Sequence, residues 1–178
     1  MRVSAKAEYA VRAMAELAEL TGEGREKVRA EDVAVRQDIP LRFLLTILGE
    51  LKQHRLVVSG RGRDGGYGLA RPAASISLAD IIRSVDGALA NVRDLRLTAV
   101  TYEGPAAPLV DVWRAVRASL RRVLEQVTLA DLVAGELQRH VQELADEYLV
   151  DNRRRAHSAD PGRPSAPAAC EQRTEYAE

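Results

Sequence analysis

Residues 59–68 read SGRGRDGGYG, and this basic, glycine-rich stretch constrains the fold more than any other part of the chain. Gly60, Gly62 and Gly65 have the G-x-G-x-x-G spacing that cradles a dinucleotide pyrophosphate, but that function needs a preceding strand and a following helix. Here a helical pattern precedes the stretch, and glycine, arginine and proline follow it. Strand-like segments at 56–59 and 67–70 instead predict a β-hairpin with a flexible tip. The sequence therefore disfavours a nucleotide site.

Three helical segments precede this hairpin. Ser4 can cap the first, whose apolar residues recur near a 3.6-residue period until two glycines end it. The second covers 30–37, with Val33 and Val35 as its main apolar residues, and the third begins at Pro40, a residue suited to a helix start. Three helices followed by a basic hairpin are typical of a winged helix-turn-helix, whose third helix enters the DNA major groove while the wing reaches phosphates or the minor groove.

The third helix, about residues 40–54, has two contrasting faces. Leucines at 41, 44, 48 and 51 share one face, and the opposite face carries Arg42, Thr46, Gly49 and Gln53. Such a polar face suits close approach to another molecule, although a plain solvated helix can look the same. The whole chain has 26 basic and 26 acidic residues, so its net charge alone indicates no polyanionic partner. Between residues 40 and 63, however, the only acid is Glu50 and the basic residues are Arg42, Lys52, Arg55, Arg61 and Arg63.

The second half of the chain predicts a long helix beyond the winged domain. Ser77 and Asp80 have capping-box spacing for a helix that Gly87 ends, and 88–107 is irregular. A helix over 108–127 would be about 30 Å long, more than a small winged domain needs for its own core. Packing on its own domain and pairing with a second copy both remain open, and we favour pairing. The predicted dimerisation residues are Leu109, Trp113, Val116, Leu120, Val123 and Leu124.

After the long helix, Thr128 and Asp131 can cap a further amphipathic helix that reaches Tyr148 and covers the pair. Residues 151–178 have the Pro, Ser, Ala and charge content of a disordered tail, which holds the single cysteine, Cys170. The N-terminal segment carries charges inside its apolar pattern, which rules out the apolar core of a signal peptide, and no uncharged run approaches the 18 residues of a membrane span. We expect a cytoplasmic protein with no membrane partner.

Four segments together resemble the Rrf-two family of bacterial transcription regulators: MRVSAKAEYAVRAM, IPLRFLLTILGELKQHRLVVSGRGRDGGYGLARP, ISLADIIRSVDG and VWRAVRASLRRVLEQVTLADL. The resemblance covers about residues 1–135 and implies homodimers on palindromic operators. It places Arg42, Phe43 and Thr46 near the bases, Ser59 and Arg61 on the wing, and the N-terminal residues near the DNA backbone. With the local charge added, the predicted DNA-binding residues are Arg2, Ser4, Lys6, Pro40, Arg42, Phe43, Thr46, Lys52, Ser59, Arg61 and Arg63.

One departure from the family concerns its iron–sulfur cluster. Cluster-bearing members use three cysteines between the helix after the wing and the long helix, and some relatives use Glu and His in the first helix. Here 88–107 contains neither Cys nor His, and Arg12 stands one turn after Glu8, where an imidazole would be needed. The histidines form no cluster that would support zinc. The sequence therefore predicts no cofactor and no metal. Within the family, the chain is most similar to the clusterless, CymR-like members, which respond to sulfur or cysteine metabolism through a metabolite or a partner enzyme.

These observations predict a mainly α fold: a winged helix-turn-helix domain at 1–87 with a two-stranded wing, a linker and candidate sensing segment at 88–107, dimerisation helices at 108–150 and a tail at 151–178. The predicted function is a homodimeric, sequence-specific DNA-binding regulator, with repression by promoter occlusion as the simpler mechanism. A protein-interaction module that uses the long helices is the alternative. An enzyme is disfavoured because no nucleophile–base spacing or metal set is present.

Overall fold

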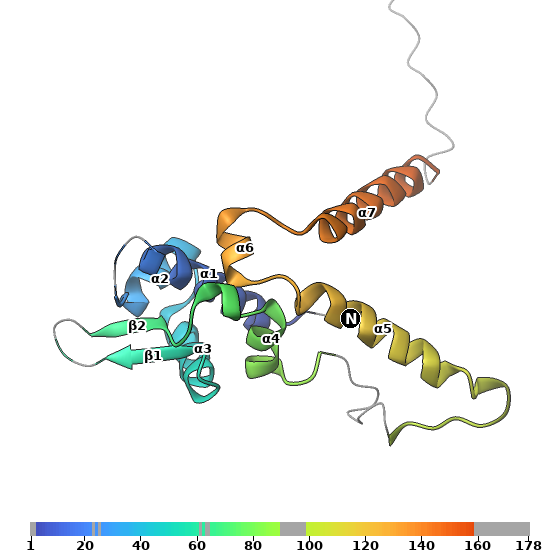
Figure 1. The fold of residues 1–178 in the computed structure, drawn as a ribbon, viewed down its shortest axis with the longest axis horizontal. Coiled ribbons are helices and arrows are strands. Elements are labelled where there is room, and N and C mark those ends of the chain that lie inside the picture. Colours follow the sequence, from blue (N-terminus) through green and yellow to red (C-terminus); the bar gives the residue numbers. More distant parts are fainter. Residues whose placement is uncertain are drawn as a thin grey trace, which may run out of the picture. The chain divides into compact units, whose positions relative to one another are not determined.

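The computed structural model describes residues 3–22, 24, 26–60, 62, 65–89 and 99–158. The chain divides into two compact units, 1–139 and 140–178. The first unit begins with three helices, α1 (Ala5–Gly22), α2 (Ala30–Gln37) and α3 (Leu41–Gln53), in the predicted order (Figure 1). Ser4 caps α1 as expected, since its hydroxyl accepts a hydrogen bond from the Ala7 amide at 2.9 Å.

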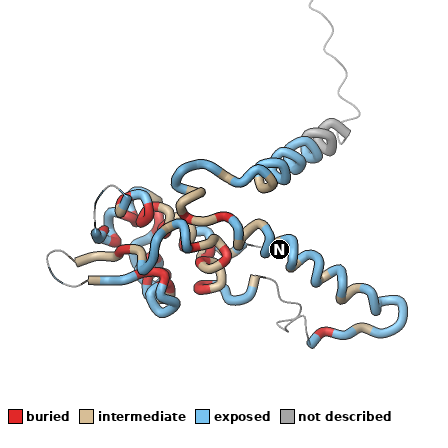
Figure 2. Tube along the Cα trace, in the orientation of Figure 1, coloured by how far each residue is buried: buried red, intermediate tan, exposed pale blue. Residues whose placement is uncertain are grey.

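The core of the first unit lies where α1 packs against α2, α3, α4 (Leu78–Asp86), α6 (Leu129–Ala134) and the second wing strand. Figure 2 shows the buried residues gathered in these elements. Its largest fully buried side chains include Met14, Leu17, Leu44, Leu48 and Leu129. Aliphatic side chains thus build the core, as the low aromatic content of 4% requires. Val35, which we expected to be a main apolar residue of α2, is 83% exposed, so Val33 alone of that pair enters the core.

The wing is an antiparallel hairpin of β1 (Val57–Gly60) and β2 (Gly66–Leu69), with Ser59 opposite Tyr67. The segment before α2 adds a bridge on the other side of β2, because the Val28 and Tyr67 backbones exchange two hydrogen bonds of 2.8 Å. A Cβ at Gly66 would lie 2.6 Å from the Val28 carbonyl oxygen, and one at Gly68 would lie 2.8 Å from the Glu26 carbonyl oxygen. These two glycines are therefore needed for close packing of the chain against β2.

The helices α4 and α6 begin side by side. The predicted capping boxes are present at both, formed by Ser77 with Asp80 and by Thr128 with Asp131. A bridge joins Ser77 to Thr128, supported by backbone hydrogen bonds from Leu78 to Val127 and from Leu129 to Ile76, each 2.9 Å long. The short 3₁₀ turn η1 (Ala73–Ser75) leads from the wing into this junction.

The long helix α5 (Leu109–Leu124) follows a 3₁₀ turn, η3 (Gly104–Ala106), and has no buried residue. Arg83 of α4 and Arg121 of α5 both donate hydrogen bonds to the Glu125 carboxylate at its end. Their donation, led by that of Arg121, lowers the pKa of Glu125 to about 2. This charged contact lies where the winged domain meets α5.

The last helices differ from the sequence prediction. A single helix was expected from Thr128 to about Tyr148, but α6 ends at Gly135, which has a φ of 69°. A second helix, α7 (Arg139–Ser158), then runs past residue 150, where the tail was expected to start. Residues 159–178, including Cys170, lie outside the described residues. Among the residues described, no helix combines the length and apolar character that crossing a membrane requires.

Candidate DNA-binding surface

The helix α3 separates its apolar and polar faces as predicted, with one exception. Leu44, Leu48 and Leu51 are fully buried, whereas Leu41, in the first turn, is 36% exposed. The opposite face is open to solvent along its length, with Arg42, Thr46, Gly49 and Gln53 all exposed. Pro40 caps the helix N-terminus and is exposed as well. α3 therefore presents an open face that is polar apart from Leu45, which is 43% exposed.

Two predicted contact residues of α1 and α3 have partners inside the domain. Lys6 forms an ion pair of 2.8 Å with Glu50, the single acid of the basic region. Phe43 lies edge-on to Tyr9, with ring centroids 5.8 Å apart, and keeps 38% of its surface exposed. These contacts fix α3 against α1. They also mean that Glu50 compensates the charge of Lys6.

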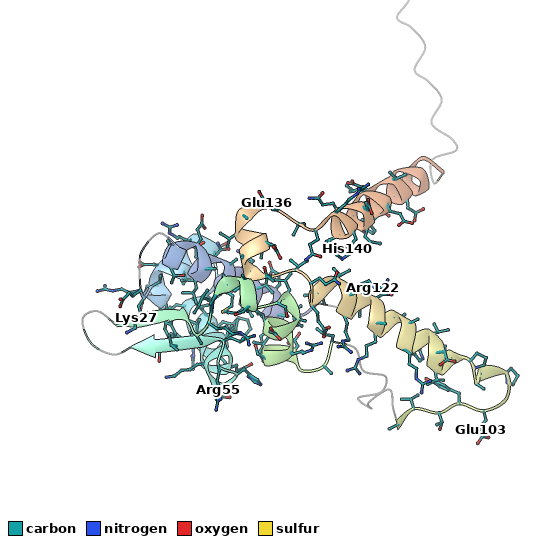
Figure 3. All side chains as sticks on the ribbon, viewed as in Figure 1. Lys27, Arg55, Glu103, Arg122, Glu136 and His140 are labelled. Carbon is teal, nitrogen blue, oxygen red and sulfur yellow. The ribbon has the colours of Figure 1, made fainter. Side chains whose placement is uncertain are left out.

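The wing is joined to α3 through Lys52, whose Nζ donates a hydrogen bond of 2.6 Å to the Ser59 hydroxyl. A neutral hydroxyl leaves the positive charge of Lys52 uncompensated. The structure adds Lys27 to this surface, since a Cβ on Gly60 would lie 2.6 Å from its Nζ (Figure 3). Sequence reasoning missed Lys27, because nothing near it predicts that the segment before α2 packs beside the wing. Two ammonium groups therefore flank the wing strand β1 at Ser59 and Gly60.

Beside this strand lies an open hollow of about 470 Å³. It is bordered by the start of α2 at Arg29, by Leu45 of α3 and by the glycines of the wing. Three predicted contact residues, Arg2, Arg61 and Arg63, lie outside the described residues. Of the predicted set, the described members thus fall on α1, on α3 and on the wing strand β1.

The turn between α2 and α3 is held from α1 by side chains. Arg12 donates hydrogen bonds to Glu8, to the Gln37 side chain at 3.3 Å and to the Gln37 carbonyl oxygen. Glu16, which is 5% exposed, accepts hydrogen bonds from Arg36 at 3.2 Å and from Gln37 at 2.6 Å. These bonds place the start of α3 relative to α1. In the fold, Arg12 is a structural residue of the helix-turn-helix.

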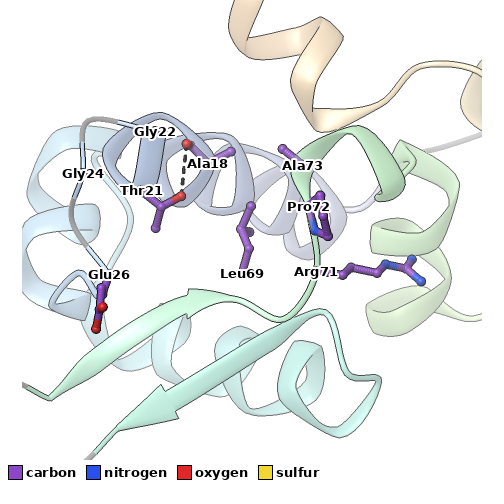
Figure 4. A pocket seen from close by; sticks show the side chains of 9 residues that line it. All are labelled: Ala18, Thr21, Gly22, Gly24, Glu26, Leu69, Arg71, Pro72 and Ala73. Carbon is purple, nitrogen blue, oxygen red and sulfur yellow. Dashed lines mark hydrogen bonds between the residues drawn. The ribbon is translucent and has the colours of Figure 1, made fainter.

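A second hollow, of about 500 Å³, lies at the C-terminal end of α1 (Figure 4). The Thr21 hydroxyl donates to backbone carbonyls of its own helix, and Arg71 is paired with Asp80 at 2.8 Å. Glu26 and Arg71 lie at opposite sides of the hollow. Of the polar side chains that line it, Thr21 and Arg71 are thus both engaged within the domain.

The predicted dimerisation residues lie along α5, and none of them is buried in the single chain. Val116 is 43% exposed, as is the neighbouring Val112 at 51%. Trp113 is half-buried and donates a hydrogen bond of 3.2 Å from its indole nitrogen to the Tyr102 hydroxyl, in the segment before η3. The remaining members, all partly buried, are Leu109, Leu120, Val123 and Leu124.

Comparison with known proteins gives consistent matches. The family model of Rrf2 (Rrf-two), described as an iron-dependent transcriptional regulator, matches residues 3–135. A protein of Mycobacterium tuberculosis (strain ATCC 25618 / H37Rv), Rv1287, whose name assigns it to the HTH-type transcriptional regulators, is 55% identical over 148 residues, 83% of this chain and 91% of that protein. IscR of Cereibacter sphaeroides, also an HTH-type transcriptional regulator, is 32% identical over 147 residues, 77% of this chain and 90% of that protein.

Two solved structures share the fold. CymR, the global cysteine regulator of B. subtilis, matches with a TM-score of 0.62 and 29% identity, covering 75% of this chain and 97% of that chain. IscR of T. potens matches with a TM-score of 0.62 and 32% identity, covering 77% of this chain and 89% of that chain. The winged-helix fold predicted from the sequence is thereby confirmed. The relatives named here are transcriptional regulators and not enzymes.

The family is described as iron-dependent, so the side chains of this protein can be compared with the ligands that iron would need. Iron–sulfur clusters are held by thiolates, at times with imidazoles, and the chain has a single cysteine, Cys170. Within the described part of the chain, no three His, Cys, Asp or Glu side chains come together as a metal site would need. In α1, the guanidinium of Arg12 is bonded to Glu8 and Gln37, at the position where an imidazole ligand would stand. The donor set does not fit a cluster.

Proposed function

We propose that this chain, which belongs to the Rrf2 family of transcriptional regulators, is a homodimeric repressor that binds palindromic operators. As a member of that family it is a DNA-binding winged-helix regulator and not an enzyme. The observation that carries the proposal is the open face of α3, which is continuous through Lys52 and Ser59 with the wing strand β1 and its two flanking lysines. A face of this kind reads base edges while the wing neutralises phosphates.

The domain assignment follows from this reading. Residues 1–87 bind DNA, 108–150 hold the dimer together and 88–107 connect the two parts. We assign effector sensing to 88–107, of which 90–98 lie outside the described residues. The Trp113–Tyr102 hydrogen bond connects the described end of this segment with α5. A change at 88–107 would therefore be transmitted to the dimer helix and from there to the spacing of the two recognition helices.

The experiment that tests the proposal selects genomic fragments on the full-length protein and then measures affinity for the selected and scrambled duplexes. We expect a short palindrome with half-sites one helical turn apart or a multiple of that. Arg42→Ala should lose about 1–3 kcal/mol per half-site, mostly on the selected sequence. Bound fragments without a common motif would contradict the proposal and favour the protein-interaction alternative.

The effector is proposed to be a metabolite or a partner enzyme, in sulfur or cysteine metabolism, rather than an iron–sulfur cluster. The observation in support is the donor set, since thiolate ligands are absent from 88–107. Protein purified without oxygen should be colourless, and its operator affinity should not respond to nitric oxide or dithionite. Stoichiometric iron with visible absorbance that survives removal of residues 159–178 would contradict this. If the protein is colourless and unresponsive, metabolites that release it from the operator are sought by fluorescence anisotropy.

A further inference from the structure

Gly49 is an unusual residue for the middle of α3. Glycine lowers helix stability relative to alanine, because its backbone loses more conformational freedom on folding. The usual structural reasons for glycine are absent here: its φ is not positive, and a Cβ built on it would meet no atom within 4 Å beyond the nearby backbone of its own helix. Alanine would fit the fold and strengthen the helix. The fold therefore does not require the glycine, and a reason for it would lie in what α3 binds.

The position of Gly49 on the helix indicates what that reason is. Residues three and four positions away are the surface neighbours of a helical residue. All four such neighbours, Leu45, Thr46, Lys52 and Gln53, are exposed. Gly49 is thus the centre of the open face of α3. A bare backbone at that point lets a bound molecule approach the helix axis more closely than any side chain would allow.

Arg55, just beyond the end of the same helix, is the opposite case: a residue other than glycine at a position that favours glycine. Its φ is 57°, the left-handed conformation that glycine adopts most easily. The Arg55 amide bonds to the Lys52 carbonyl at 3.0 Å, and the Leu56 amide to the Leu51 carbonyl at 2.9 Å. These two bonds are those of a Schellman motif, in which glycine is the favoured residue at the position that Arg55 occupies. Helix α3 therefore has a glycine where alanine would be more stable, and an arginine where glycine would be.

The charge of Arg55 gives a reason for the arginine. Its side chain is exposed, projects from the end of α3 (Figure 3) and has no acidic partner among the residues that the structure describes. It belongs to the basic region between 40 and 63, close to Lys52 in sequence. An arginine in this setting is suited to a phosphate, for which its planar guanidinium offers two parallel hydrogen bonds.

We propose that Gly49 and Arg55 are DNA-contact residues of α3, kept at a cost in helix stability. Gly49 lets the middle of the helix close against the wall of the major groove, and Arg55 holds a backbone phosphate beyond the end of the helix. This inference rests on the proposed function, in which α3 is the recognition helix. It is distinguishable from that function because stability and DNA affinity should change in opposite directions.

The first test replaces Gly49 with alanine in the full-length protein. Tm should rise by about 2–4 °C, as expected for the gain in helix propensity in a chain of this size. Affinity for the selected operator should fall about ten-fold or more, because a methyl group in a tight interface forces the partners apart. Gly22→Ala is the matched control: Gly22 ends α1, and its added Cβ would also meet no atom within 4 Å. It should leave operator affinity unchanged.

The second test replaces Arg55 with glycine and, separately, with lysine. Arg55→Gly should raise Tm, since it relieves the left-handed backbone. It should also make the slope of log K against log salt shallower by about 2 for the dimer, because each protomer loses one phosphate contact. Arg55→Lys keeps the cation and the backbone strain, so both the slope and Tm should stay near those of the original protein. The double variant Gly49→Ala/Arg55→Gly should be the most stable and the weakest binder.

The outcomes separate the two levels of inference. If the original protein selects no palindrome, the proposed function fails. The original protein can select a palindrome that Arg42→Ala binds more weakly. If Gly49→Ala then binds that palindrome as well as the original protein does, the proposed close approach of DNA at Gly49 is wrong. A fall in Tm for Gly49→Ala would also overturn it, because the glycine would then serve the fold. An unchanged salt slope for Arg55→Gly would contradict the proposed contact between Arg55 and a phosphate.

Discussion

The winged domain and α5 are both built from amphipathic helices, yet only the winged domain covers its own apolar faces. Met14, Leu48 and Ile81 have no exposed surface, whereas α5 has no buried residue and leaves Val116 43% exposed. An apolar stripe indicates that a helix will pack against something, but it does not indicate whether the packing partner is the same chain or another one. The first region therefore folds as a unit, whereas α5 keeps an apolar face that is suited to a second copy of the chain. Such a closed pair would bury the same stripe from both protomers.

The largest expected effect is therefore on assembly. Leu120→Asp should place a charge in the apolar seam of α5 and convert the dimer to monomer, without unfolding the winged domain. Because two linked half-sites are lost, operator affinity should fall by about 100- to 10,000-fold. Sedimentation and fluorescence anisotropy measure the two effects. Ser119→Asp is the control, since Ser119 is exposed and its hydroxyl donates a hydrogen bond to the Ala115 carbonyl oxygen of the same helix. A Leu120→Asp variant that stayed dimeric would show that the apolar face of α5 does not form the dimer interface.

The next effect, on stability, tests the same contrast from the other side. Leu48→Ala removes a fully buried side chain and should lower the free energy of unfolding by about 2–5 kcal/mol. Val116→Ala leaves the winged core untouched and should act only through the pair of α5 helices. Its Tm should therefore shift by an amount that changes with protein concentration, whereas the Leu48→Ala deficit should persist at every concentration. Calorimetry over a concentration series separates the two. If Val116→Ala lowered Tm by the same amount at every protein concentration, α5 would be packed against its own chain rather than against a second copy.

Local signals in the sequence predicted the winged domain well. Capping boxes, helical periodicity and turn residues act over a few positions, so both boxes and the hairpin were predicted and are confirmed. The break between α6 and α7 was missed, because apolar residues continue past Gly135 at helical spacing. The glycine nevertheless takes a left-handed φ and ends the helix there.

Contacts between distant segments were the part that the sequence could not predict. The bridge from Val28 to Tyr67 brings Lys27 to the wing, and the ion pair from Lys6 to Glu50 occupies a predicted DNA-contact residue. Each depends on how helices pack rather than on any nearby pattern. The DNA-contact residues and the dimer seam stay predictions.

The smallest expected effect concerns the junction between the two regions. Glu125 accepts hydrogen bonds from Arg121 and from Arg83 of the winged domain, which lower its pKa from 4.5 to about 2. A carboxyl whose pKa is lower in the folded state stabilises the fold above its ordinary pKa and loses that contribution as pH falls through the folded value. The contribution of Glu125 should thus be complete above about pH 5 and vanish toward pH 2. Because the group is solvent-accessible, the effect should be modest and should weaken with added salt.

Glu125→Gln should accordingly lower Tm slightly at neutral pH and make the acid-induced fall in Tm shallower, so that its curve meets that of the original protein near pH 2. Asp111→Asn is the matched control, because the ion pair that Asp111 forms with Arg114, at 2.9 Å, lies within α5. If Glu125 joins the two regions, its variant alone should also loosen the operator complex, since the recognition helices would be held less firmly relative to the dimer axis. Identical acid curves for Glu125→Gln and the original protein would show that the junction is maintained by the backbone bridge at Ser77 and Thr128, with the ion pair adding nothing.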